Sequence, residues 1–391
     1  YGWKMLHTSE LTVLDQDRNL VSQWQSRLPE ILDSPDEVLV EAMREIMEPA
    51  NLLFTHHLDI TGQAGGAVQL LSTICEERLG DRSIALTLLG GLGDIDSAEP
   101  SFVLWDLGRM VAQNSELSSI FNAGLQDLEL RLRHSDAAKE FINNFDHFLE
   151  TFGSRGPNEW ETACETWGTN PSSVLTLIDR MRLTDAQNSP KVRALELSKK
   201  REAATLDARK ELKGFGSWLF EKALHSSVLF SQARERSKTT IVDLIHVARL
   251  MTRELANRTA EQRENAELID LWFILENELD EFIDNPSAYD EKISERKRVR
   301  GELSNRVPPF IFEGKIPDPS SWPLRSEVKV NHNAHANPGE ILKGFGGCPG
   351  VAEGTAKVIT DPSDPKDLGP GDILIAPLTD PSWTPLFVPA E

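Results

Sequence analysis

A short basic run on a predicted helix carries the residue types best suited to hold a phosphoryl group. Within Ser231–Thr240, Arg234 and Lys238 are four residues apart, so both side chains project from one side of a helix. Arginine offers a planar pair of donors to phosphate oxygens, and lysine offers a mobile point charge. The run therefore indicates an anion site, although a solvated helix face with salt bridges to neighbouring acids has the same pattern.

A second candidate cluster lies in a loop that glycines bracket. In the segment Gly153–Trp160, Arg155 is followed four residues later by Glu159. This spacing predicts a folded loop that an Arg155–Glu159 salt bridge pins in place. The same two side chains are equally suited to contact a substrate, and the sequence leaves both roles open.

Other motifs of self-contained active sites are missing from the sequence. It has no phosphate-binding P-loop, no zinc-protease HExxH, no GxSxG elbow and no EF-hand loop. The glycines of Gly90–Gly93 are interpreted as a helix boundary, because no predicted strand precedes them. The pair His332 and His335 has no cysteine or acidic companion nearby, so no metal ligand is assigned.

Composition narrows the class of partner. The 391 residues carry a net charge of −21, which argues against binding to nucleic acid or to an anionic membrane surface. Three separate cysteines without a CxxC pair fit a reducing compartment, and we expect the cytoplasm. No stretch approaches the roughly 20 apolar residues of a membrane span, and no signal peptide is recognised.

The hydrophobic pattern predicts a mainly α fold with a strand-bearing C-terminal segment. A large helical domain is expected over residues 1–327, followed by a polar, proline-rich linker at 328–339. Residues 340–391 then open a small β-containing domain that looks incomplete. Helices are predicted at 63–80, 101–113, 116–134, 136–152, 172–183, 190–229, 239–259 and 262–284, and strands at 351–360 and 373–377.

Three C-terminal blocks carry a resemblance to a known family. GCPGVAEGTAKVI at 347–359, LGPGDILIA at 368–376 and TDPSWTPLF at 379–387 resemble the opening of the swivelling phosphohistidine domain of PEP-utilising enzymes. The helical part is similar to the middle domain of rifampin phosphotransferases. Its matching segments are Leu89–Pro100, Phe152–Glu159, Trp167–Pro171 and Arg234–Lys238.

This resemblance implies an ATP-dependent phosphotransferase with three domains. An ATP-grasp domain of the same polypeptide, with ATP and Mg²⁺, would phosphorylate a histidine of the swivelling domain. That domain would then carry the phosphoryl group to a hydroxyl of a small-molecule acceptor in the helical domain. By the match, Arg234 and Lys238 would neutralise the transferred group. The residues expected to contact the acceptor are Arg155, Glu159, Glu235 and Thr240, where Thr240 stands in place of an expected glutamine.

Two parts that the family has are missing from this sequence. No ATP-grasp domain and no GG-x-x-SH block with the phosphohistidine occur in it, and that block is expected soon after Pro389. We therefore expect a fragment of the enzyme. The sequence also has no TIM barrel, which argues against PEP synthesis. The alternative is a non-catalytic helical binding or scaffold protein that keeps the family's fold.

Overall fold

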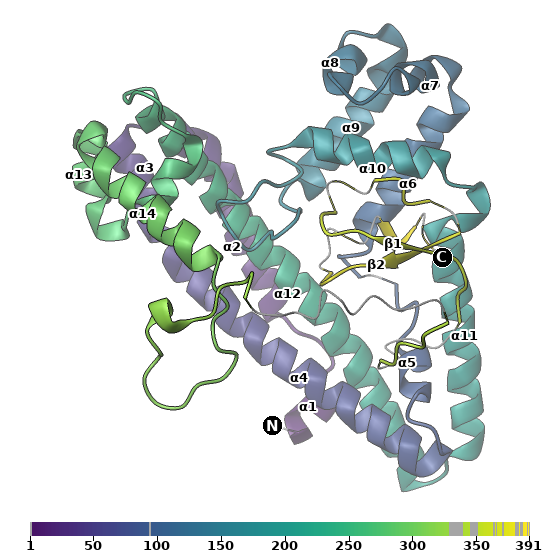
Figure 1. The fold of residues 1–391 in the computed structure, drawn as a ribbon. Coiled ribbons are helices and arrows are strands. Elements are labelled where there is room, and N and C mark those ends of the chain that lie inside the picture. Colours follow the sequence, from purple (N-terminus) through teal and green to yellow (C-terminus); the bar gives the residue numbers. More distant parts are fainter. Residues whose placement is uncertain are drawn as a thin grey trace. The chain divides into compact units, whose positions relative to one another are not determined.

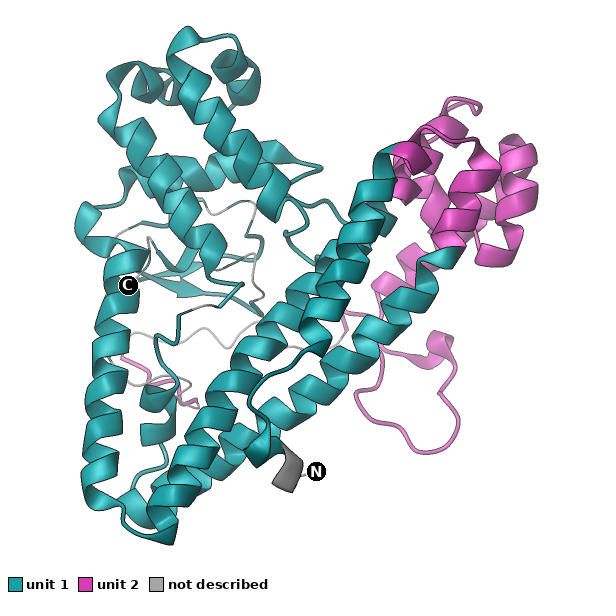
Figure 2. Cartoon of the chain, turned by 180° about the vertical axis from the view of Figure 1, so that it is seen from behind, with its two compact units in different colours: residues 1–29, 45–249, 348–391 teal, residues 30–44, 250–347 magenta. Residues whose placement is uncertain are grey.

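The computed structural model is mainly helical, which confirms the predicted fold class. It describes residues 2–93, 95–327, 339–344, 351–362, 364, 366–369, 371–379, 383, 386–388 and 390. The chain divides into two compact units (Figure 2): unit 1 has residues 1–29, 45–249 and 348–391, and unit 2 has residues 30–44 and 250–347. The predicted division into 1–327 and 340–391 stays a prediction. Apart from Gly339, the predicted linker 328–339 lies outside the described residues.

Two long helices form the framework of unit 1 (Figure 1): α4 (Met47–Leu79) and the part of α12 (Phe215–Ala260) up to residue 249. Ile60, Ala64 and Ala67 of α4 share a buried cluster with Phe230 and Ala233 of α12. The small alanines let the two helices approach closely, and the apolar row on α4 repeats at helical spacing. α4 ends at Gly80, whose φ of 78° is the left-handed conformation that terminates helices.

The other helices of unit 1 accompany this pair, and those between residues 99 and 183 build an aromatic core. Buried Phe121, Phe141, Phe145, Phe148 and Trp167 lie in one cluster. The helices are α1 (Gly2–His7), α2 (Val13–Leu32, of which residues 13–29 belong to unit 1), α5 (Ile84–Leu88), α6 (Glu99–Gln113), α7 (Ser115–Asn122), α8 (Leu128–Arg133), α9 (Lys139–Phe152), α10 (Pro171–Leu183) and α11 (Pro190–Glu211). Short 3₁₀ turns lie at Asp136–Ala138 and Ala186–Asn188. Among the described residues, no helix is both long and apolar enough to pass through a membrane.

The predicted C-terminal strands are present. β1 (Thr355–Val358) pairs in parallel with β2 (Asp372–Ile375), with Thr355 opposite Asp372. The residues of both strands are exposed or half-buried, but Ile359 and Leu386 are buried in the same cluster as the aromatic residues of the helices. The C-terminal segment therefore contacts helical side chains of unit 1 at these positions.

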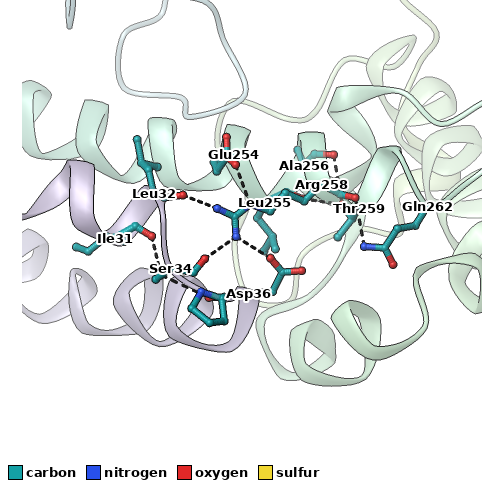
Figure 3. Close-up of polar contacts among 11 residues, drawn as sticks. Ile31, Leu32, Ser34, Asp36, Glu254, Leu255, Ala256, Arg258, Thr259 and Gln262 are labelled. Atoms are coloured by element: carbon teal, nitrogen blue, oxygen red, sulfur yellow. Dashed lines mark hydrogen bonds and ion pairs between the residues drawn. The ribbon is translucent and has the colours of Figure 1, made fainter.

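Unit 2 is organised around a polar centre at Arg258 (Figure 3). The Arg258 guanidinium donates to the carbonyls of Leu32 and Ser34 and pairs with Asp36 and Glu254. These donors satisfy backbone carbonyls that the end of α2 leaves without helical partners. The remaining elements are α3 (Asp36–Glu45), α13 (Leu279–Asp284), α14 (Asp290–Ser304) and 3₁₀ turns at Leu268–Phe273, Glu276–Glu278, Pro286–Tyr289 and Pro319–Ser321.

Several helix boundaries differ from the sequence prediction: α4 begins well before the predicted helix 63–80, and the predicted helix 116–134 is divided into α7 and α8. The predicted helix 190–229 is two helices, because Gly214 adopts a left-handed φ of 59° between α11 and α12. α12 runs without interruption through residues 231–240, where the basic run was predicted to lie on a helix. The predicted helix 262–284 is present only at its end, as α13. Before it, Asn265 is left-handed and the Asp270 carboxylate accepts a hydrogen bond from the Glu267 backbone N–H, and 3₁₀ turns take the place of a helix.

The glycine run 90–93 has a packing role. Gly91 lies so close to α11 that a Cβ there would sit 2.6 Å from the backbone nitrogen of Ser198. Arg201 of α11 donates to the carbonyls of Gly90 and Gly91. The structure thus supports the interpretation as a helix boundary over that of a phosphate cradle.

Candidate functional site

The salt bridge predicted between Arg155 and Glu159 is present and buried. Arg155 Nε lies 3.0 Å from Glu159 Oε2, and the other carboxylate oxygen lies 2.8 Å from Lys238 Nζ on α12. The Glu159 side chain is 1% exposed, and those of Arg155 and Lys238 are 4% and 16% exposed. One carboxylate therefore holds two cations, which come from the two clusters that the sequence singled out separately.

Glycines allow the loop that carries Arg155 to fold back on itself. Gly168 donates from its backbone N–H to the Gly153 carbonyl at 2.9 Å, and Trp167 donates to the Arg155 carbonyl at 2.8 Å. A Cβ on Gly153 would lie 2.2 Å from the carbonyl oxygen of Leu149. No side chain fits at Gly153, so the glycine that opens the motif is required by close backbone approach.

Arg249 ties this loop to α12. It is fully buried and donates to the carbonyls of Glu159 at 2.7 Å, Cys164 at 3.1 Å and Glu161 at 3.1 Å. The sequence analysis missed this residue. The sequence pattern that could have identified Arg249 is its position as a charged residue between the apolar residues Val247 and Met251, which are both buried in the helix.

Arg155 also offers a donor that no described group accepts. Its Nη1 donates to Thr239 Oγ1 at 3.0 Å. Its Nη2 is buried and has no hydrogen-bond partner within the part of the chain that the structure describes. A buried donor of this kind is costly unless something binds it, so Nη2 is suited to receive a ligand oxygen.

Aromatic side chains flank Lys238. Its Nζ lies 5.8 Å from the centre of the Trp160 ring, and Trp160 makes an edge contact with Phe54 at 6.2 Å and a tilted contact with His57 at 6.1 Å. Trp160 is 39% exposed and Phe54 is 45% exposed, so both present ring surface to solvent. The cations therefore lie beside an exposed aromatic surface.

His57 lies close to both residues of the basic run. Its Nδ1 is 2.8 Å from Ser237 Oγ. Burial lowers the pKa of His57, and the charges of Arg234 and Lys238 lower it further, against an opposing contribution from Glu235. The ring is therefore neutral at pH 7.

The remaining predicted residues are less tightly bound into the cluster. Arg234 is half exposed and pairs with its neighbour Glu235 at 2.7 Å. Thr240 is buried and donates to the Arg236 carbonyl of its own helix at 2.9 Å. The structure joins Arg155, Glu159 and Lys238 directly, with Arg234 near His57 beside them. The roles of all six residues at an acceptor site stay predictions.

A buried carboxyl group lies behind the cluster. Asp243 Oδ1 accepts a hydrogen bond from Ser154 Oγ at 2.7 Å. Burial raises the pKa of Asp243 to about 6, although Ser154 and Arg155 favour its ionised form, while Asp96 and Glu159 add to the rise. Sequence reasoning missed Asp243, although Ser154 lies inside the loop motif that it identified.

The raised pKa predicts a stability effect of known sign. In the unfolded chain Asp243 ionises near 3.8, so the folded state holds its proton to higher pH and loses stability as pH rises from about 4 to above 6. Asp243→Asn is therefore expected to increase the free energy of unfolding by on the order of 2–3 kcal/mol at pH 8 and by roughly half of that at pH 5. Urea unfolding at both pH values measures this. Asp207→Asn, at an exposed ion pair with Lys210, is the control, and an equal gain at both pH values would contradict the assignment.

Comparisons with known proteins show which family this chain is similar to. Residues 56–235 match the family model described as "Rifampicin phosphotransferase fourth domain". Rifampicin phosphotransferases of Streptomyces sviceus, Bacillus cereus and Bacillus subtilis are similar to the chain at 22–26% identity. These findings support a rifampicin phosphotransferase-like member of the PEP-utilising family. The matched range includes the Arg155–Glu159 loop and Arg234, and it ends three residues before Lys238.

The similarity to rifampicin phosphotransferases extends beyond the matched domain. The Streptomyces sviceus protein is 25% identical over 368 residues, which is 92% of this chain and 40% of that protein. The "Uncharacterized phosphotransferase YvkC" of Bacillus subtilis is 23% identical over 312 residues, 75% of this chain and 36% of the relative. The "Prodigiosin synthesizing transferase PigC" of Serratia marcescens is 24% identical over 328 residues, 81% of this chain and 36% of the relative. The chain thus spans well under half the length of these relatives, and they support a phosphotransferase family.

Proposed function

We propose that this chain is the acceptor-binding part of an ATP-dependent phosphotransferase. A phosphohistidine that lies outside residues 1–391 would transfer its phosphoryl group to a hydroxyl of a small molecule. The observation that carries the proposal is the buried Arg155–Glu159–Lys238 cluster, in which Arg155 Nη2 has no hydrogen-bond partner among the described residues. The similarity to proteins named rifampicin phosphotransferase supports the class of reaction.

The charges of the cluster suit a transferred phosphoryl group. Arg155, Lys238 and Arg234 supply three cations, while Glu159 and Glu235 supply two carboxylates. Asp243 adds a third carboxyl group behind them, so the cluster has no excess of positive charge, and what suits a phosphoryl group is the placement of the cations beside Arg155 Nη2, which has no hydrogen-bond partner among the described residues. Phosphoryl transfer depends on positioning and on neutralising the charge of the equatorial oxygens, and fixed cations provide both.

In the proposed reaction the acceptor oxygen forms a bond to phosphorus while the bond between phosphorus and the histidine nitrogen breaks. The histidine nitrogen that loses the phosphoryl group takes the proton of the acceptor hydroxyl. Lys238 would leave Glu159 in part to meet a phosphoryl oxygen, and Arg155 Nη2 would donate to the same group. Glu159 is thus a positioning residue, because it holds both cations before the phosphoryl group arrives.

ATP and Mg²⁺ belong to the proposal but are not assigned to residues of this chain. Over the described ranges, no group of three or more His, Cys, Asp or Glu side chains is placed to hold a metal ion. We assign both cofactors to an ATP-grasp domain of the same polypeptide. We also propose a cytoplasmic location, for which the sparse unpaired cysteines are the support.

The proposal is tested by labelling the complete protein. Incubation with ATP labelled at the β or the γ phosphorus is expected to yield an acid-labile, alkali-stable phosphoprotein, as a phosphohistidine requires. Adding hydroxylated small molecules singly then identifies the acceptor by loss of that label and by gain of a labelled product. If neither phosphorus labels the protein, the proposed function is wrong and the binding or scaffold alternative takes its place.

A further inference from the structure

The hydrogen bonds of His57, on α4, determine which of its two ring nitrogens carries the hydrogen. Nδ1 lies 2.8 Å from Ser237 Oγ on α12, and the same hydroxyl donates its only hydrogen to the Arg234 carbonyl at 3.0 Å. Ser237 Oγ can therefore only accept from the ring, so Nδ1 carries the hydrogen and donates it. In the neutral ring, Nε2 is then the nitrogen with the lone pair.

The lone pair of Nε2 has only a long polar contact within the described part of the chain. Its neighbour is Thr61 Oγ1, one turn further along α4, at 3.5 Å, whereas a well-formed hydrogen bond from a hydroxyl is about 2.8 Å long. The residue is half-buried and not enclosed. Nε2 is therefore the ring nitrogen at which a hydroxyl of a bound molecule would gain a good hydrogen bond.

His57 lies beside the cations that suit a phosphoryl group. Its ring makes a tilted contact with the Trp160 ring at 6.1 Å, and the centre of the Trp160 ring is 5.8 Å from Lys238 Nζ. The hydrogen bond of Nδ1 ends on Ser237, the residue directly before Lys238. The charged groups that act on the ring are Arg234, Lys238 and Glu235, all on α12. A lone pair that can accept a hydrogen and two cations that can bind phosphate oxygens thus share one site.

We propose that His57 is the catalytic base of phosphoryl transfer and that its Nε2 takes the proton of the acceptor hydroxyl. The inference rests on the proposed function and adds a catalytic residue to it. The acceptor O–H bond breaks and its proton passes to Nε2, while the O–P bond forms and the bond between phosphorus and the phosphohistidine nitrogen breaks. His57, now an imidazolium, then returns the proton to the nitrogen that has lost the phosphoryl group, so the net reaction is unchanged. Ser237 is a positioning residue, because it holds the hydrogen of the neutral ring on Nδ1.

The surroundings of His57 suit a base that must be unprotonated when the reaction begins. Burial lowers the pKa of the ring, and the charges of Arg234 and Lys238 lower it further, so the neutral form is present at pH 7. A phosphoryl group that binds these two cations brings negative charge close to the ring and raises its pKa again. The ring thus becomes the stronger base at the stage at which the acceptor hydroxyl must lose its proton.

Two substitutions separate a catalytic His57 from one that only joins α4 to α12. His57→Asn places an amide nitrogen near the position of Nδ1, where it can still donate to Ser237, and leaves nothing in place of Nε2. His57→Gln places an amide near the position of Nε2, but an amide takes up no proton at pH 7. The control is His147→Asn, at a histidine of α9 whose side chain is 79% exposed.

The complete protein is loaded with labelled ATP, and single-turnover transfer of the label is followed to the hydroxylated compound that removes it from the wild-type phosphoprotein. We expect both His57 variants to lower the transfer rate by roughly 10²-fold or more, and His147→Asn to change it by less than about twofold. The KM for that compound should change by less than about twofold in all three, because Nε2 meets only the hydroxyl. All three should form the phosphoprotein at the wild-type rate, since that step uses no residue of α4.

Two further measurements respond to a base and not to a structural histidine. The wild-type transfer rate should fall at acid pH as His57 becomes protonated, and His57→Asn should lack this decrease. Hydrogen–deuterium exchange at the C2 position of the ring, read by mass spectrometry without any acceptor, should give a pKa of His57 below 6.5.

These measurements distinguish failure of the base from failure of the proposed function. A His57 that is protonated at pH 7, or transfer at the wild-type rate in His57→Asn, overturns the base and leaves the phosphotransferase standing. Failure of the wild-type protein to form a phosphoprotein rejects the proposed function, and the base with it.

Discussion

Lys238→Ala is expected to lower the kcat of phosphoryl transfer by roughly 10²- to 10³-fold, as removal of one preorganised charge donor does in other enzymes. Lys238 Nζ is held 2.8 Å from a carboxylate that is itself buried, so the cation is fixed in direction before any ligand binds. The variant lacks the positive charge of Lys238, which would contact the phosphoryl group only during its transfer. The KM for the acceptor should change much less, because Lys238 is proposed to contact the phosphoryl group rather than the body of the acceptor.

The matched control is Lys191→Ala. Lys191 pairs with Asp106 at 2.7 Å, but both side chains are 55% exposed, and a surface pair of this kind contributes little. Single-turnover transfer from the labelled phosphoprotein to the acceptor measures the step directly. If Lys238→Ala transfers at the wild-type rate, or if Lys191→Ala is equally impaired, the assignment of Lys238 is wrong.

The fold class and the loop salt bridge were predictable because both depend on local sequence. Helical periodicity identifies α6, α9 and the second half of α4, and an Arg–Glu spacing of four residues indicates a pair that one turn can close. The start of α12 was not predictable, since the periodic pattern of 190–229 continues past Gly214, where the chain turns. The apolar pattern at 262–284 also fits a helix, and only the side-chain bond of Asp270 to the backbone excludes it.

The contact between the two predicted clusters lies beyond sequence reasoning. Glu159 and Lys238 are 79 positions apart, and nothing in the spacing says that one carboxylate serves both Arg155 and Lys238. The same holds for the bond between Ser154 and Asp243 and for the three carbonyls that Arg249 binds. Such long-range pairs depend on how α12 packs against the loop, and this packing cannot be inferred from a single sequence.

Glu159→Ala is expected to be the most destabilising single change in the site, at about 3–5 kcal/mol of unfolding free energy. The substitution removes the carboxylate that pairs with two cations. The Arg155 side chain is only 4% exposed, so water cannot hydrate its charge in place of the lost carboxylate. Lys238 is 16% exposed and recovers part of its hydration. Urea unfolding of the variant and the wild-type protein at pH 7 measures the loss.

Burial, rather than the presence of an ion pair, should decide the size of this effect. Glu129→Ala breaks another Arg–Glu pair at four-residue spacing, the one with Arg133 at 2.9 Å, but at a site where both side chains contact solvent and Arg133 keeps Asp146. Its cost should stay below about 1 kcal/mol. The double variant Arg155→Met/Glu159→Met should recover part of the loss of Glu159→Ala, because it removes the stranded cation together with its partner. A cost of Glu159→Ala no larger than that of Glu129→Ala would mean that the cluster is solvated in solution, and Glu159 could not then hold Arg155 and Lys238 in place for an incoming phosphoryl group.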